Sequence, residues 1–294
     1  MPFRYPVCVT LDRYTGIQTA VLAINEVAAR EFVANAEASG KAASYIFEKC
    51  FKHGMLVSRG YFPEFQKRRT RYYVAQTYEL LEVFYREFRA EFEQFFGADS
   101  WRQQSNEQRN KEGDEGLLYE ILRNILGGSE LKPDPYVAIV EYYRLVRNCV
   151  VHAMPDDEVE KKLKKGPAKT SERLVERYKK EVPKKEYTFD APNSIHALTF
   201  DDVRLCSRCM QRLARRISEL ATPSAQQMVN AVFCGNGGEA FRRSYRRFGA
   251  PPDGKDERTK ARLKKALQFR LMDRYGLTVS EAAEILEKAP WPIA

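Results

Sequence analysis

The chain is poor in the features from which metal sites and membrane spans are built. It has three histidines in 294 residues, and no stretch approaches the roughly 18 to 20 apolar residues that a membrane-spanning helix needs. Its first residues, MPFRYPVCVTLDRY, lack the basic and then apolar pattern of a signal peptide. We therefore expect a cytoplasmic protein that does not enter a membrane.

Paired cysteines are also scarce. Of the six cysteines, only Cys206 and Cys209 are close in sequence, as CSRC in a segment with helical periodicity. A structural zinc site needs about four ligands, and the nearest further candidates are the single residues Cys234 and His196. We expect packed, reduced thiols and no metal site, with zinc binding at CSRC as the less favoured alternative.

Helical periodicity dominates the sequence, and it predicts an all-α fold. Hydrophobic residues make up 44% of the chain and charged residues 30%, as in a globular protein. Between Val74 and Phe95 large apolar residues recur at three- and four-residue steps, the pattern of a long amphipathic helix. Further helices are expected at 17–38, 43–56, 116–126, 135–152 and 200–221, whereas 187–200 could hold a short extended pair.

The last forty residues predict a helical hairpin. Gly276 would close its first helix, and Thr278 with Glu281 would form a capping box for the second. We divide the chain into an N-terminal helical extension (1–65), a helical domain with a basic insertion at 155–190 (66–222), and a C-terminal helical accessory region (223–294).

The formal charge of +9 is unevenly distributed. Residues 161–185 and residues 242–274 each carry a net charge of +8, which leaves the rest of the chain negative. Such segregation favours a polyanionic partner, because Lys and Arg that neutralise phosphates release counterions. Two solvated basic segments are the alternative interpretation.

Polar residues end an otherwise apolar helix at RNCVVH, residues 147–152, just before Pro155. At about 100° per residue, Ile139, Tyr143, Val146 and Val150 form the face expected to contact the core. Arg144, Asn148 and His152 lie on the opposite side, interleaved with valines 137, 140 and 151. We interpret this mixed face as a second interface enclosing a polar cleft, such as a homodimer contact.

RNCVVH, at a helix end in a domain opened and closed by long amphipathic helices, resembles the signature of the HEPN superfamily (higher eukaryotes and prokaryotes nucleotide-binding domain) over roughly residues 70–220. The resemblance implies a HEPN-like helical bundle. It also implies a metal-independent, cofactor-free endoribonuclease in which Arg147 and His152 are catalytic and Asn148 supports them. Two protomers would bring their motifs together, and cleavage would leave 2′,3′-cyclic phosphate and 5′-OH ends.

The RNA would be bound beyond the motif as well. We expect contacts from Arg144 and from the basic insertion, through Lys161, Lys162, Lys164 and Lys165. Antitoxin-controlled members of the superfamily carry Tyr two residues after the His, where this chain has Met154. The accessory regions suit a toxin or antiviral defence effector, with room for a neutralising or activating protein partner.

Alternatives remain open at this stage. Arg147 could form an interhelical ion pair with Glu141 or with a neighbouring helix, and His152 could interact only with the helix dipole. The chain would then be a non-catalytic module that binds nucleotide or RNA or mediates assembly. A DNA-reading helix-turn-helix at the C-terminus is disfavoured, because its second helix carries Glu281, Glu284 and Glu287.

Overall fold

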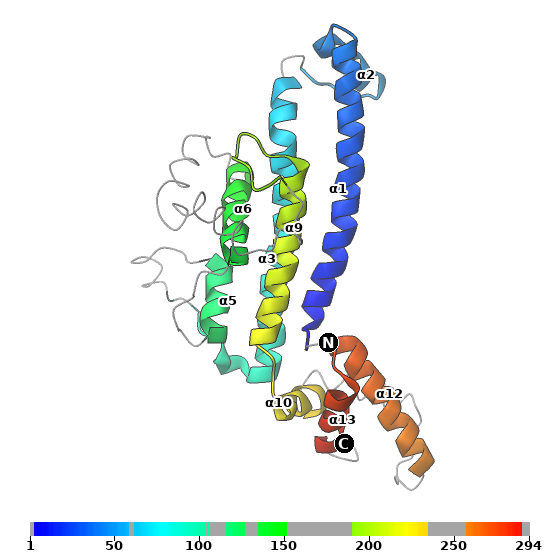
Figure 1. Ribbon diagram of the computed structural model, residues 1–294, viewed down its shortest axis with the longest axis vertical. Helices are drawn as coiled ribbons and strands as arrows, with labels where there is room; N and C mark the ends of the chain where they lie inside the picture. The colour runs from blue at the N-terminus through cyan, green and yellow to red at the C-terminus, as the bar shows by residue number, and fades with distance from the viewer. Residues whose placement is uncertain are drawn as a thin grey trace. The chain divides into compact units, whose positions relative to one another are not determined.

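The computed structural model describes residues 3–58, 62–103, 105, 116–126, 135–151, 190–234 and 257–289. Every regular element in these ranges is a helix, which confirms the all-α fold class (Figure 1). None of the described helices has both the length and the hydropathy that a membrane span requires.

The helices follow one another along the chain with short connections where these are described. The long ones are α1 (Pro6–Ala38), α3 (Phe62–Phe96), α6 (Pro135–Val151), α9 (Phe200–Leu220) and α12 (Glu257–Tyr275). The shorter ones are α2 (Ala42–Lys52), the 3₁₀ turn η2 (Ala98–Ser100), α5 (Gly116–Leu126), α10 (Ala225–Val229), the π-helical turn η4 (Asn230–Cys234) and α13 (Val279–Lys288).

Most of the sequence-predicted helices are confirmed, and local signals explain their ends. Gly276 adopts φ 65°, the left-handed conformation that ends α12 at low steric cost. The Thr278 side chain accepts from the Glu281 amide at 3.3 Å, and the Glu281 carboxylate accepts from the Thr278 amide at 2.7 Å. This capping box begins α13, as predicted.

The short extended pair expected within 187–200 is wrong for the part that is described. Residues 190–199 form bends and turns before α9 begins at Phe200. Their polar groups are satisfied by side chains instead of a strand partner, chiefly by the buried Asp202. The backbone therefore has no need of a β ladder here.

Contacts divide the chain into two compact units, each assembled from separate segments. Unit 1 contains Met1–Leu11, Glu82–Leu131 and Ala214–Ala294, and unit 2 contains Asp12–Leu81 and Lys132–Leu213. The boundaries proposed from the sequence, at 65/66 and 222/223, stay predictions.

Aromatic side chains dominate the core of unit 1. Phe3 stacks on Tyr275 with ring centroids 5.9 Å apart, and the Tyr5 ring meets Phe95 and Phe88 edge-on. The Tyr5 hydroxyl donates to the Ala221 carbonyl at 2.8 Å, which satisfies the only polar atom of this buried side chain. The N-terminal residues are thus part of the core of this unit.

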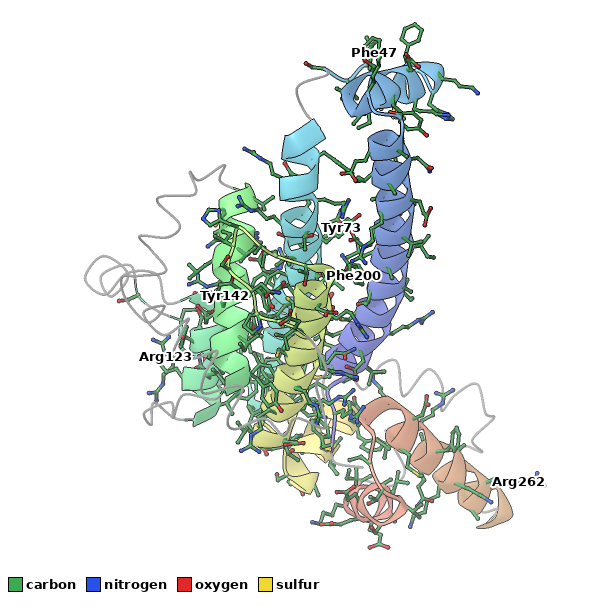
Figure 2. The ribbon with its side chains drawn as sticks, turned by 45° about the horizontal axis from the view of Figure 1, so that its top comes forward. Phe47, Tyr73, Arg123, Tyr142, Phe200 and Arg262 are labelled. Atoms are coloured by element: carbon green, nitrogen blue, oxygen red, sulfur yellow. The ribbon has the colours of Figure 1, made fainter. Side chains whose placement is uncertain are left out.

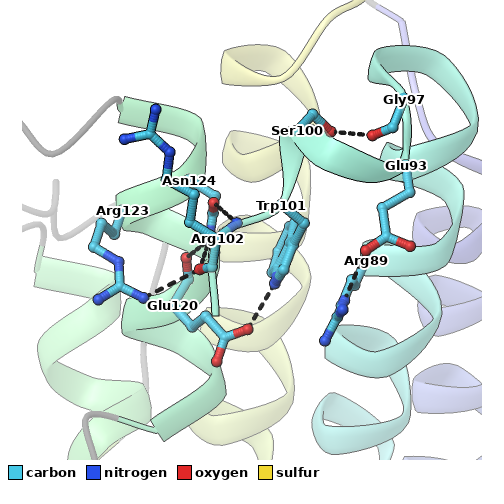
Figure 3. A network of polar contacts seen from close by, with 9 residues as sticks. All are labelled: Arg89, Glu93, Gly97, Ser100, Trp101, Arg102, Glu120, Arg123 and Asn124. Carbon is cyan, nitrogen blue, oxygen red and sulfur yellow. Dashed lines mark hydrogen bonds and ion pairs between the residues drawn. The ribbon is translucent and has the colours of Figure 1, made fainter. Parts of the chain in front are cut away.

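A second cluster in unit 1 fixes the segment that follows α3 (Figure 3). The indole nitrogen of Trp101 donates to the Glu120 carboxylate at 2.6 Å, and the Arg102 amide donates to the Asn124 side chain at 2.7 Å. Arg89 lies over the Trp101 ring, 5.6 Å from its centroid. These contacts hold residues 101 and 102 against α5.

In unit 2, α3 and α9 lie between α1 and α6 (Figure 1). Thr19 of α1 is hydrogen bonded to Ser207 of α9 at 3.1 Å, and Glu26 of α1 is ion paired with Arg69 of α3 at 2.9 Å. On the other side, α6 contacts α3 through the ion pair of Arg147 with Glu79, and it contacts α9 through the hydrogen bond from Tyr143 to Asp202. This arrangement positions the helix that carries RNCVVH.

Candidate functional site

Helix α6 carries Arg147 and Asn148 near its C-terminal end. Pro135 is its first residue, where the missing N–H costs nothing and the fixed φ favours the helix, as the sequence predicted. The helix continues through Val151, so the backbone up to the residue before His152 is regular. His152 itself, with Lys161, Lys162, Lys164 and Lys165, lies outside the described residues.

More than half of the circumference of α6 faces the core of unit 2. Ile139, Tyr143 and Val146 are fully buried, as expected. Val140 is fully buried too, so its assignment to a second interface was wrong: the packing of α3 and α9 covers a wider arc than one hydrophobic stripe. Val151 is half exposed and Val137 is partly exposed, so these two valines still fit that assignment.

Arg147 forms an ion pair between helices. Its Nη2 lies 2.8 Å from Oε1 of Glu79 on α3, and its Nε donates to the same oxygen at 3.0 Å. Its Nη1 donates to the side-chain oxygen of Asn148 at 3.1 Å. The structure therefore brings two of the three predicted motif residues together and adds Glu79, which sequence reasoning missed.

The exposure of this ion pair is asymmetric. The Arg147 side chain is 16% exposed, whereas that of Glu79 is 49% exposed. A pair open to water on one side contributes roughly 0 to 1 kcal/mol to stability. Its larger effect is geometric, because it fixes the plane of the guanidinium through two of its nitrogens while a third bonds Asn148.

Arg144, the predicted RNA contact one turn earlier, bonds within its own helix. Its Nε donates to Glu141 at 2.8 Å, three residues before it. Burial raises the pKa of the Glu141 carboxyl, although Arg144 opposes the shift. Glu141 thus serves Arg144. Of the two ion pairs that the sequence offered for Arg147, the one with a neighbouring helix is confirmed, with Glu79 of α3 as the partner.

The buried side of α6 is anchored by Asp202, the third residue of α9. One carboxylate oxygen accepts from the Tyr143 hydroxyl at 3.0 Å and from the Asn193 amide at 2.8 Å. The other accepts from the Thr199 amide at 2.8 Å and from Nδ2 of Asn193 at 2.9 Å. The Tyr142 hydroxyl donates to the Asn193 carbonyl. The sequence indicated Asp202 only as an acidic residue in the first turn of a helix.

The CSRC segment forms part of the α9 core. Cys206 and Cys209 are both fully buried, and the Cys206 sulfur lies 3.6 Å from the Met210 sulfur. Burial raises the pKa of the Cys206 thiol well above its ordinary value, and the nearby Cys209 adds to the shift. These are properties of packed thiols. No group of three or more metal-ligating side chains occurs within the described ranges.

Comparison of the chain with protein-family models, with curated proteins and with solved structures gave no match.

Proposed function

We propose that this protein is a metal-independent endoribonuclease of the HEPN type. The observation that carries the proposal is the pairing of Arg147 with Asn148 at the end of α6, with the guanidinium oriented from α3 by Glu79. An oriented guanidinium is a planar donor suited to phosphate, and His152 follows Arg147 by five residues in the sequence. The segregated basic charge supports a polyanionic substrate.

The proposed reaction is a transesterification followed by release of the product. The ribose 2′-OH attacks the adjacent phosphorus, the bond from phosphorus to the 5′ oxygen breaks, and a 2′,3′-cyclic phosphate and a 5′-OH are formed. His152 takes part in the transfer of the 2′-OH proton, and the leaving 5′ oxygen gains a proton. Arg147 stabilises the negative charge that develops on the phosphoryl oxygens.

Two protomers contribute one motif each in the proposed enzyme. We call the face of α6 that carries Arg144 and Asn148 the polar arc. The half-exposed Val151 and the partly exposed Val137 border it and would lie in that contact. RNA, a second protomer and a controlling protein are the proposed partners, and a toxin or antiviral defence effector is the proposed biological role.

A non-catalytic module that binds RNA or mediates assembly is the second candidate. The ion pair of Arg147 with Glu79 favours it, because a residue that joins α6 to α3 already has a structural role. The two candidates differ in whether removal of Arg147 or His152 abolishes a reaction.

The test is RNA cleavage by purified protein in EDTA, with the ends of the products mapped. His152→Ala and Arg147→Ala should each lower activity by roughly 10²- to 10⁴-fold, and Arg147→Lys should fail as well because an ammonium has no planar fork. The matched controls are His53→Ala on α2 and Arg216→Ala on α9, a guanidinium that pairs with Glu219 three residues later. Both controls should keep full activity.

Loss of activity is separable from loss of fold, because the ion pair is open to water on its Glu79 side and its loss should cost at most about 1 kcal/mol. Activity retained in His152→Ala, or activity that needs added Mg²⁺, would contradict the proposal. RNA binding without cleavage by the wild type would support the second candidate.

A further inference from the structure

Helix α1 has two opposite faces, and the other helices of unit 2 cover one of them. Its inner face includes Thr15, Leu22 and Glu26, which are all buried. Roughly opposite, five large apolar side chains are between 51% and 69% exposed, and we call them the outer stripe: Tyr14, Ile17, Val21, Ile24 and Val27. Single exposed hydrophobic residues are ordinary, but a contiguous row of this length marks an interaction surface.

The spacing of the outer stripe is that of a coiled-coil seam. Tyr14, Ile17, Val21 and Ile24 follow steps of three, four and three residues, and Ala28 and Glu31 extend the same series. Such a 3.5-residue period keeps one narrow seam facing a second helix. The seam runs for two and a half heptads, or about 27 Å at 1.5 Å per residue.

The outer stripe of α1 has exposed charged residues at its two ends and none along its length. Between Arg13 and Arg30 the one charged residue is Glu26, and its side chain is buried on the inner face, where it is ion paired with Arg69. Arg13 and Glu31, at opposite ends, are both exposed. A membrane-surface helix would instead have Lys and Arg along the flanks of its apolar face.

We propose that the outer stripe of α1 binds the same stripe of a second copy of this chain, in antiparallel orientation. In this orientation Arg13 approaches Glu31 of the second copy, whereas a parallel pair would place like charges together at both ends. Antiparallel pairing of the seam also sets Val21 against Ile24 and Ile17 against Ala28 of the second copy. The contact is self-complementary and closes with two-fold symmetry.

The size of the contact fits a reversible dimer. Two helices of about 10 Å diameter paired over about 27 Å bury on the order of 1,000 Å² in total, near the lower limit for a specific interface. Interfaces of this size are typical of weak or transient association. It is a different surface from the polar arc of α6, since α3 and α9 lie between α1 and α6 in unit 2 (Figure 1).

Sedimentation velocity over a range of protein concentrations tests the association. Val21→Glu combined with Ile24→Glu should weaken it at least about 100-fold, because four carboxylates would be placed in the dimer seam. The matched control is Val279→Glu on α13, a valine as exposed as Val27 at 61%. This control should associate like the wild type, and all variants should keep the far-UV circular dichroism of the wild type.

Cysteine cross-linking tests the orientation without a destabilising charge. A mixture of Ile17→Cys and Ala28→Cys proteins should form a disulfide-linked dimer under mild oxidation, above the background of the wild type. Ile17→Cys alone should not, because its two copies would be about 16 Å apart along the axis, beyond the reach of a disulfide. A wild type that is monomeric throughout, equal association of the Glu variants and the control, or self-linking of Ile17→Cys would overturn the proposal. The cross-links report on α1 alone, so they are independent of RNA cleavage and of any contact through α6.

Discussion

Replacing Asp202 with Asn should loosen the helix that carries the motif without touching the motif itself. The Asp202 carboxylate is fully buried and connects three parts of unit 2: α9, the turn at 193–199, and Tyr143 on α6. The amide has nearly the same shape, so the substitution changes hydrogen bonding and charge while leaving the packing volume unchanged.

The expected loss in the free energy of unfolding follows from the donors around each oxygen of the Asp202 carboxylate. One oxygen accepts from Tyr143 and from the Asn193 amide, and the other accepts from the Thr199 amide and from Nδ2 of Asn193. If the oxygen that faces Tyr143 becomes the NH₂ group, two donors lose their acceptor; if the other does, three lose it, because the Thr199 hydroxyl also donates there at 3.3 Å. One of the donors is a backbone N–H in each case. A buried donor left unsatisfied costs about 1 to 3 kcal/mol, so two such donors should lower the free energy of unfolding by about 2 to 6 kcal/mol.

Urea unfolding followed by far-UV circular dichroism measures this loss. The neighbouring substitution Asp201→Asn is the matched control, because the Asp201 side chain is 33% exposed and pairs with Arg204 at 3.2 Å within the same helix. It should change the free energy of unfolding by less than about 1 kcal/mol. Tyr143→Phe should cost about 1 kcal/mol by removing one hydrogen bond.

A variant with both substitutions, Tyr143→Phe and Asp202→Asn, isolates the contribution of the hydrogen bond between these two side chains. When the NH₂ group of Asp202→Asn faces Tyr143, this substitution and Tyr143→Phe remove the same hydrogen bond, so their effects should sum to more than the effect of the double variant. If Asp202→Asn is no less stable than Asp201→Asn, the role assigned to Asp202 as the anchor of α6 is refuted. Strict additivity would refute only the contribution of its bond with Tyr143.

Three further outcomes are expected. Burial raises the pKa of the Glu91 carboxyl to about 7 from 4.5, so between these pH values the folded state holds a proton that the unfolded state has lost. The free energy of unfolding should therefore fall as the pH rises from about 4.5 to 7. Glu91→Gln should remove this pH dependence, as measured by urea titrations at each pH. Glu79→Gln should lower the kcat of RNA cleavage about tenfold with little change in KM, because a neutral amide orients Arg147 less firmly; a faster variant would show that Glu79 competes with the phosphate. The last substitution replaces four lysines of the basic insertion by Gln: Lys161, Lys162, Lys164 and Lys165. The slope of log binding constant against log salt concentration for RNA should become shallower by up to about three. An unchanged slope would show that these lysines do not contact RNA.

The sequence by itself determined the helices of this protein and several of their ends. The apolar period between Val74 and Phe95 appears as the buried face of α3, and the capping box at Thr278 begins α13 as predicted. These features depend on side chains within about four residues of one another along the chain, and such contacts can be predicted from spacing alone. The prediction failed at 190–199, where the amides of Asn193 and Thr199 donate to the Asp202 side chain and not to a strand partner.

Only the tertiary structure decided which side chains meet across helices. Arg147 pairs with Glu79, 68 residues earlier, whereas Glu141 on its own helix pairs with Arg144, three residues later. Val140 is buried because two helices cover α6, whereas the outer stripe of α1 is exposed because unit 2 covers one face of that helix. A helical period specifies which residues share a face, but it does not specify which neighbour covers that face or whether any does. That choice depends on how the helices pack against one another, and this is where the partners of the motif residues were determined.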